Sequence, residues 1–161
     1  MKHGHVGLGF DVHRLEEGRP CKLGGVLLPY PAGPVGHSDG DAVLHALTDA
    51  VLGAAGLGDI GELFPDDDPR WKDADSGELL KAAMRDVRRA GFVVGNVDVV
   101  VATEGPRIRP HREALRASIA ALLGVGPECV GIKGKTLEGL GALAEGRAVA
   151  VQAICFLVRG G

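Results

Sequence analysis

The chain has 161 residues, of which 45% are apolar and only 4% aromatic, and its formal net charge is −3. This length favours one domain, residues 1–161, with a core of aliphatic side chains. The small net charge and scattered basic residues argue against a nucleic-acid partner, and the absence of a long apolar run from the sequence argues against a membrane partner. Three widely spaced cysteines argue against a disulfide framework or a thiolate zinc site, so we expect a cytoplasmic protein.

The first predicted element is a β-strand at residues 6–12. A period of two places Asp11 and His13 on one face of this strand or of its end. Such an Asp-x-His pair is most often only a polar strand edge. Asp and His are also ligand types that suit a tetrahedral Zn²⁺ whose fourth position stays open for water or substrate. A zinc site of this kind would need a third ligand from another element.

Residues 22–30 predict a short hairpin around a Gly-Gly turn, and residues 31–37 predict a loop. His37 at the end of that loop precedes a predicted helix. Free N–H groups and the helix dipole favour an anion at such a position, so His37 could face a bound phosphate. An ordinary solvated surface histidine is the equally good alternative.

The stretch that follows predicts a helix of about four turns, because apolar residues at 43, 44, 47, 51 and 52 form a helical stripe. We expect Ser38 or Asp39 to cap its start and Gly56 to end it.

Asp41, His45 and Asp49 recur every four residues on another face of this helix. A polar stripe is usually a solvated face, but the alanines around this one favour close packing. His45 could therefore join Asp11 and His13 as the third zinc ligand, although spacing alone does not prove that the three meet.

The remaining predicted elements are an acidic turn at 64–69, a helix capped by Asp75 and stopped by Gly91, a strand at 96–103, a loop with two arginines at 104–110, a helix at 111–123, a strand at 130–135, a Gly-rich loop at 136–141 and a strand at 148–158. The acidic turn could bind a hard cation or a ribose hydroxyl, or it could be merely solvated.

Apolar residues occupy both faces of the last strand, and helices can shield only one side of a small sheet. We therefore predict an α+β fold, in which a small mixed sheet carries helices on one face in a ferredoxin-like plan and a second copy of the chain covers the other face.

The sequence resembles the 2-C-methyl-D-erythritol 2,4-cyclodiphosphate synthases of the non-mevalonate isoprenoid pathway over nearly its whole length. The motifs that carry the resemblance are G-F-D-V-H at 9–13, G-G-V at 24–26, H-S-D-G-D-x-x-x-H-A-L-T-D-A at 37–50, L-G-D-I-G-x-L-F-P-D at 57–66, G-N-V-D at 95–98, P-x-x-x-P-H at 106–111 and K-x-K-T-x-E-x-L-G at 133–141. The resemblance implies a homotrimer with active sites between subunits. It also implies a reaction in which 4-diphosphocytidyl-2-C-methyl-D-erythritol 2-phosphate is cyclised and CMP is released.

The same resemblance implies roles for individual residues. Asp11, His13 and His45 would bind zinc, His37 and Thr136 would stabilise the transition state, and Glu138 would assist a second divalent ion, Mg²⁺ or Mn²⁺. The implied substrate-binding residues are Asp11, His13, His37, Ser38, Asp59, Ile60, Gly61, Phe64, Asp66, Asp68, Thr103, Pro106, Arg107, Lys135, Thr136 and Glu138.

Two other functions remain open from the residues alone. A zinc-dependent phosphohydrolase acting on a nucleotide diphosphate would use metal-bound hydroxide, and a non-catalytic binding module would enclose its zinc with four protein ligands. A further hypothesis concerns Asp49, which could orient the His45 ring because it lies one helical turn away.

Overall fold

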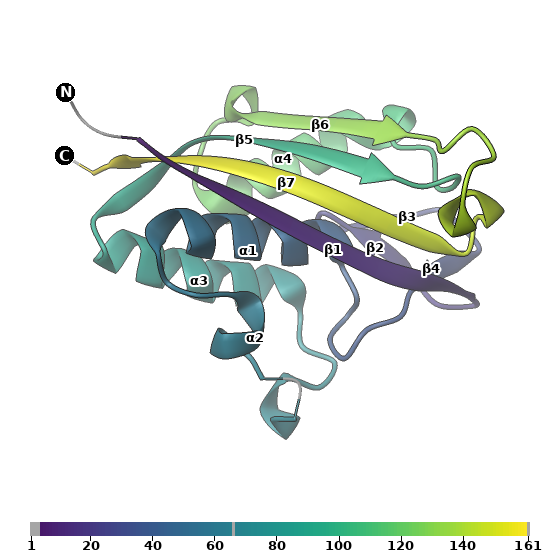
Figure 1. The fold of residues 1–161 in the computed structure, drawn as a ribbon, viewed down its shortest axis with the longest axis horizontal. Helices are drawn as coiled ribbons and strands as arrows, with labels where there is room; N and C mark the ends of the chain where they lie inside the picture. Colours follow the sequence, from purple (N-terminus) through teal and green to yellow (C-terminus); the bar gives the residue numbers. More distant parts are fainter. Residues whose placement is uncertain (1–3, 66, 161) are drawn as a thin grey trace.

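The computed structural model describes residues 4–65 and 67–160, which form a mixed α+β fold (Figure 1). The strands are β1 (His5–Glu17), β2 (Cys21–Leu23), β3 (Val26–Leu28), β4 (Ala32–Pro34), β5 (Phe92–Ala102), β6 (Val130–Lys135) and β7 (Ala148–Arg159). The helices are α1 (Ala42–Ala55), α2 (Ile60–Leu63), α3 (Ser76–Arg89) and α4 (Arg112–Leu123), and the 3-10 turns are η1 (Pro69–Trp71), η2 (Arg109–His111), η3 (Pro127–Cys129) and η4 (Ala142–Glu145).

The main sheet has the strand order β4-β1-β7-β5-β6, and β2 pairs with β3 in a separate hairpin. β7 runs antiparallel to both β1 and β5, whereas β5 and β6 are parallel neighbours joined through α4. The order of the long strands and of the helices that cover the sheet is β1-α1-α3-β5-α4-β6-β7, which differs from the β-α-β-β-α-β order of the expected ferredoxin-like plan. The sequence predicted most of these elements but not which strands pair.

Helices α1, α3 and α4 lie on one face of the main sheet (Figure 1). On β7 the predicted alternation is confirmed, since Val149, Val151, Ala153 and Cys155 are fully buried towards the helices. Ile154 and Phe156, which point to the opposite face, remain exposed. The core therefore lies between the helices and one side of the sheet.

The packing of α1 against β1 depends on two glycines. A Cβ atom added to Gly7 would lie 2.0 Å from the Ala50 carbonyl oxygen, and one added to Gly9 would lie 1.8 Å from the Ala46 carbonyl oxygen. No side chain fits in either space, so the strand and helix backbones approach directly. Because side chains alternate along β1, Asp11 continues the row that Gly7 and Gly9 begin.

The start of α1 differs from the prediction. The N-cap is Asp41, whose carboxylate accepts hydrogen bonds from the backbone N–H groups of Leu44 at 3.1 Å, Gly24 at 2.8 Å and Gly25 at 2.7 Å. The two glycines adopt φ angles of +58° and +78° in the β2–β3 turn, which directs their N–H groups at this carboxylate.

The prediction of Ser38 or Asp39 as the cap is therefore wrong, and so is the placement of Asp41 on a ridge with His45. The helix begins at Ala42, so Asp41 precedes it and turns back over the helix end.

Two strand predictions also needed correction. The sequence pattern predicts a loop at residues 32–34, yet they pair with residues 15–17 of β1 as a short edge strand. Pro and Gly obscure such a strand in a sequence. β5 begins earlier than predicted, at Phe92. The sequence pattern misses this start because the sheet register shifts between Val94 and Asn96, and this bulge interrupts the alternation of side chains.

The other predicted helices and strands are confirmed, although β1 extends beyond the predicted range to Glu17. Asp75 caps α3, and Gly124 ends α4 at a φ of +76°. Among the described residues, none of the helices combines the length and the apolar composition needed to cross a bilayer.

Candidate metal centre and adjoining cavities

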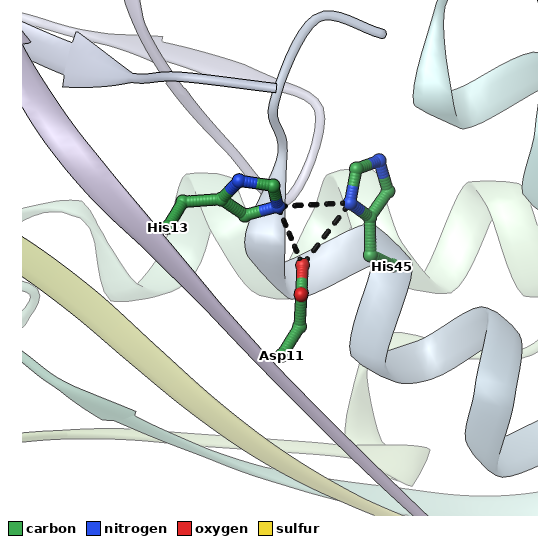
Figure 2. Close-up of side chains that lie close together, drawn as sticks. All are labelled: Asp11, His13 and His45. Atoms are coloured by element: carbon green, nitrogen blue, oxygen red, sulfur yellow. Dashed lines mark hydrogen bonds and ion pairs between the residues drawn. The ribbon is translucent and has the colours of Figure 1, made fainter. Parts of the chain in front are cut away.

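Three side chains from two elements converge at one point (Figure 2). β1 presents Asp11 and His13 on the same face, and α1 presents His45 towards them. Asp11 Oδ2 lies 2.8 Å from His13 Nε2 and 3.0 Å from His45 Nδ1, and the two ring nitrogens are 3.2 Å apart. The predicted meeting of the three residues is therefore confirmed.

The tautomer of His13 can be assigned from its other neighbour. His13 Nδ1 lies 2.5 Å from the carbonyl oxygen of Val35. A carbonyl oxygen can only accept a hydrogen bond, so Nδ1 carries the proton and Nε2 of the neutral ring directs its lone pair at Asp11 and His45. Either a proton on Nε2, which then hydrogen-bonds to Asp11, or a metal cation fits at this point.

The charge of Asp11 suits a cation. Burial alone would raise the pKa of Asp11, but hydrogen bonds with His13 and His45 outweigh burial and hold that pKa well below its usual value. Burial would lower the pKa of His13, but its hydrogen bond and ion pair with Asp11 outweigh this effect and raise that pKa. Asp11 is therefore ionised at neutral pH.

The donor set fits a divalent metal. One carboxylate oxygen and two imidazole nitrogens lie within 4.8 Å of one another, and these three side chains make up the group among the described residues. Nitrogen and oxygen donors of this kind suit divalent transition metals. The three side chains keep 13–24% of their surface exposed, so a further ligand could reach the centre from outside.

A cavity of about 220 Å³ adjoins the centre. Its lining combines polar and apolar side chains, and among the apolar ones Phe64 and Trp71 pack edge to face at 5.0 Å between ring centroids. The lining residues are Asp11, His13, His37, Ser38, His45, Asp49, Ile60, Gly61, Phe64, Trp71 and Leu79. The cavity can thus hold a ligand with both a charged part and a small apolar part.

Trp71 and Leu79 were missed from the sequence. Trp71 is the only tryptophan of the chain and follows the predicted acidic turn, which was a usable signal. Leu79 belongs to a helix with a regular apolar stripe, so nothing distinguished it from a core residue.

The acidic residues near this cavity have mostly local partners. Asp59 caps α2 by accepting a hydrogen bond from the Glu62 N–H at 2.8 Å, and Asp68 caps η1 and pairs with Arg70. Neither is among the lining residues of the cavity. Asp66 was also predicted to bind substrate and lies outside the described residues.

The hypothesis that Asp49 orients His45 is wrong. The Asp49 carboxylate accepts a hydrogen bond from the Ile60 N–H at 2.8 Å, and it thereby tethers α2 to α1. Nε2 of His45 lies instead 2.9 Å from the hydroxyl oxygens of both Ser38 and Ser76. One helical turn brings Asp49 near the centre but not within reach of that ring nitrogen.

A second cavity, of about 180 Å³, lies beside the carboxyl end of β6. Its lining is strongly cationic and consists of Thr103, Pro106, Arg107, Ile108, Arg109, Arg112, Gly134, Lys135 and Thr136. Arg112 had not been singled out from the sequence. Glu138 lies outside this lining and accepts a hydrogen bond from the Thr136 hydroxyl at 2.6 Å. The two cavities share no lining residue, so they are separate within a single chain.

Comparisons with known proteins agree with this geometry. The YgbB family matches residues 5–158. The chain is 53% identical over 152 residues to the 2-C-methyl-D-erythritol 2,4-cyclodiphosphate synthase of Laribacter hongkongensis, with 94% of each chain covered. The bifunctional IspDF from Campylobacter jejuni has a TM-score of 0.95 at 42% identity, covering 99% of this chain and 43% of that longer one. A CDP-bound 2C-methyl-D-erythritol-2,4-cyclodiphosphate synthase has a TM-score of 0.87 at 46% identity, covering 94% of this chain and 99% of the other.

Proposed function

The chain belongs to the YgbB family, and on this premise we propose that it converts 4-diphosphocytidyl-2-C-methyl-D-erythritol 2-phosphate to 2-C-methyl-D-erythritol 2,4-cyclodiphosphate and CMP. The observation that carries this proposal is the convergence of Asp11, His13 and His45 beside a cavity lined by both polar and apolar side chains. Relatives at about half identity over nearly the whole chain are named for this reaction.

The reaction is an intramolecular substitution at phosphorus. An oxygen of the 2-phosphate forms a bond to the β-phosphorus, and the bond from that phosphorus to the oxygen bridging the two phosphates breaks, so CMP leaves with the electron pair. An ionised phosphate is already a nucleophile, so the reaction requires no general base. The protein must instead fold the substrate until the reacting atoms lie roughly 3–3.5 Å apart, and must offset phosphate charge.

We assign Zn²⁺ to the centre because two histidines and one aspartate, with a fourth position open, are typical of catalytic zinc. When bound there, the ion would act as a Lewis acid on a diphosphate oxygen, which is worth several kcal/mol in such reactions. Asp11, His13 and His45 would hold it. His37 and Ser38 line the same cavity, where we expect them to orient the phosphates.

The two cavities suit the two ends of the substrate. Ile60, Gly61 and Phe64 offer an apolar surface for the methylerythritol part, with Asp59 and Asp68 on neighbouring turns. We keep Asp66 as a proposed substrate-binding residue from the resemblance alone. The cationic second cavity suits the cytidine phosphates through Arg107 and Lys135, with Thr103 and Pro106 beside them. Thr136 would stabilise the transition state, and its partner Glu138 would hold a second divalent ion, Mg²⁺ or Mn²⁺.

A homotrimer would bring these cavities together. The sheet face opposite the helices exposes a row from β1, with Val6 68%, Leu8 65%, Phe10 55% and Val12 50% exposed. An apolar face of this kind favours association. We propose that three copies pack through this face, which would place the metal centre of one chain opposite the second cavity of its neighbour.

Residues 1–161 would act as a single cyclodiphosphate synthase domain. We place it in the cytoplasm, because Cys21, Cys129 and Cys155 are free thiols and a reducing compartment keeps them so.

The phosphohydrolase alternative is not favoured, since the relatives are named as cyclodiphosphate synthases. The binding-module alternative requires four protein ligands, whereas the group found among the described residues has three.

The test is CMP release from the diphosphocytidyl substrate by purified protein, with and without chelator. We expect the chelator to stop CMP release, Zn²⁺ to restore it, and His13→Ala to reduce it at least 100-fold. His5→Ala is the matched control, because His5 lies near the other end of β1 against Phe92. Full activity in protein shown to be metal-free would contradict the proposed function.

A further inference from the structure

We propose that Ser76, Asp39 and Lys22 form a hydrogen-bonded relay that fixes the tautomer and orientation of His45, and that they are positioning residues for the metal centre. This inference rests on the proposed function, because it assumes that His45 is a metal ligand. Figure 2 shows the Nδ1 edge of His45 directed at Asp11 and His13, which leaves the Nε2 edge for other partners.

The first link in the relay joins His45 to Ser76. The Ser76 hydroxyl oxygen lies 2.9 Å from His45 Nε2, and Ser76 is completely buried at the first residue of α3. The Ser38 hydroxyl lies at the same distance from Nε2 and 3.4 Å from the Ser76 hydroxyl. His45 therefore contacts a hydroxyl pair on the side away from the metal ligands.

The second link decides which group donates. The Ser76 hydroxyl donates to Asp39 Oδ1, and the Ser76 N–H donates to Asp39 Oδ2 at 3.2 Å. An ionised carboxylate can only accept, and a hydroxyl has one proton. With that proton directed at Asp39, the Ser76 oxygen can only accept from the imidazole. His45 must then carry its proton on Nε2 and keep the lone pair of Nδ1 free for the metal.

The third link anchors Asp39. The Lys22 ammonium lies 2.7 Å from Asp39 Oδ2 and 2.5 Å from Asp75 Oδ2. Lys22 belongs to β2, Asp39 to the loop before α1, and Asp75 caps α3. One ammonium thus fixes three segments around the Ser76 hydroxyl. Partners that hold a metal-bound histidine in this way typically change metal affinity 10–100-fold when they are removed.

The test uses Ser76→Ala, with Thr48→Val as the matched control. Thr48 is a buried residue of α1 whose hydroxyl donates only to the Leu44 carbonyl oxygen of its own helix. Zinc affinity is measured by competition with a chelator. The Nε2–H proton of His45 is followed by NMR in zinc-loaded protein labelled with ¹⁵N-histidine.

We expect Ser76→Ala to weaken zinc binding 10–100-fold and to speed the exchange of the His45 Nε2–H proton with water. Thr48→Val should change neither quantity. Asp39→Asn, which keeps an acceptor oxygen but loses the charge, should give an intermediate loss, and it serves as the second variant if Ser76→Ala does not fold.

Unchanged zinc affinity and unchanged proton exchange in both Ser76→Ala and Asp39→Asn would overturn the relay while leaving the proposed function intact. A wild-type protein that binds zinc and responds to these variants as expected, but releases no CMP, would support the relay and overturn the proposed function. A wild-type protein that binds no zinc would overturn both.

Discussion

Lys22 links two acidic residues whose ionisation depends on it. Burial alone would raise the pKa of Asp39, but hydrogen bonds from Lys22 and Ser76 outweigh it and lower that pKa below the ordinary 3.8. The hydrogen bond from Lys22 likewise lowers the pKa of Asp75. A carboxyl group whose pKa falls on folding contributes stability above its ordinary pKa and loses this contribution as the pH falls through the folded-state value.

The first prediction follows from this dependence of stability on pH. Lys22→Met should lower the free energy of unfolding at pH 7 by about 1 kcal/mol, because the pair with Asp39 is partly shielded whereas Asp75 is largely exposed. The difference from wild type should shrink as the pH falls below 3.8 and both carboxylates become protonated. Urea unfolding at pH 7, 5 and 3 measures this. A difference that stays constant over this range would show that lost packing, not charge, explains the effect.

Single residues also show where sequence reasoning succeeds and where it stops. Asp11, His13 and His45 were predicted as one group from their chemistry, and the structure brings them together. Asp41 and Asp49 have the same residue type and the same spacing from His45, yet one caps the helix and the other holds α2. Spacing along a helix predicts which helix face a carboxylate lies on. It does not predict the hydrogen-bond partner of that carboxylate, which can come from another segment.

At the scale of elements, the close approach of α1 to β1 sets the geometry of the metal centre. Gly9 contacts the Ala46 backbone. The proposed ligand Asp11 lies two residues further along the same face of β1, and the proposed ligand His45 directly precedes Ala46. Any separation of the two backbones at Gly9 would therefore also separate these ligands.

The second prediction compares two glycines. Gly9→Ala should destabilise the protein by about 1–3 kcal/mol or more, because its Cβ would overlap backbone atoms of α1. It should also weaken zinc binding. Gly53→Ala is the control, since its Cβ would meet nothing within 4 Å and alanine in a helix should stabilise by about 0.5–1 kcal/mol. Chemical denaturation measures both. Equal stability of the two variants would contradict the close contact.

The third prediction concerns α2, which Asp49 tethers through Ile60. Asp49→Ala should raise KM about tenfold, because a hydrogen bond to a charged group is worth about 1.5–3 kcal/mol and α2 lines the cavity. Zinc content should be unchanged. Asp86→Ala, which removes a partly buried carboxylate of α3 that pairs with Arg89, is the control. Loss of zinc from Asp49→Ala, with KM unchanged, would instead restore the hypothesis that Asp49 supports His45.

Most elements could be predicted from periodicity and turn residues, and their boundaries were the weak point. The β2–β3 hairpin, α3 and α4 were predicted from glycine turns and caps. β4 was missed because it contains Pro and Gly, and it is a strand only through its pairing with β1. That pairing joins two segments that are distant in sequence, and a local sequence pattern does not predict such a pairing.

At the scale of the whole molecule, the two faces of the sheet differ. One face is buried under helices, and the other exposes apolar side chains of β1 together with Ile154 and Phe156 of β7. The alternation in β7 predicted this difference. The strand order could not be predicted, because several orders bury the same side chains equally well.

The fourth prediction tests the proposed homotrimer. Leu8→Lys should reduce the mass in solution from that of three chains to that of one, because it places a charge in the apolar face. CMP release should fall with it, since the two cavities would separate. Leu27→Lys is the control, as Leu27 on β3 is equally exposed at 69% but lies outside this face. Light scattering measures the mass. A trimer that persists in Leu8→Lys would place the interface elsewhere.

In the proposed reaction a metal-bound centre promotes attack of the substrate on its own diphosphate. The most direct test is ³¹P NMR of the products formed from 4-diphosphocytidyl-2-C-methyl-D-erythritol 2-phosphate by zinc-loaded protein. We predict one cyclic diphosphate with two coupled phosphorus signals, together with CMP in equal amount. Methylerythritol products that carry only open phosphate groups would show that water is the nucleophile and would contradict the claim.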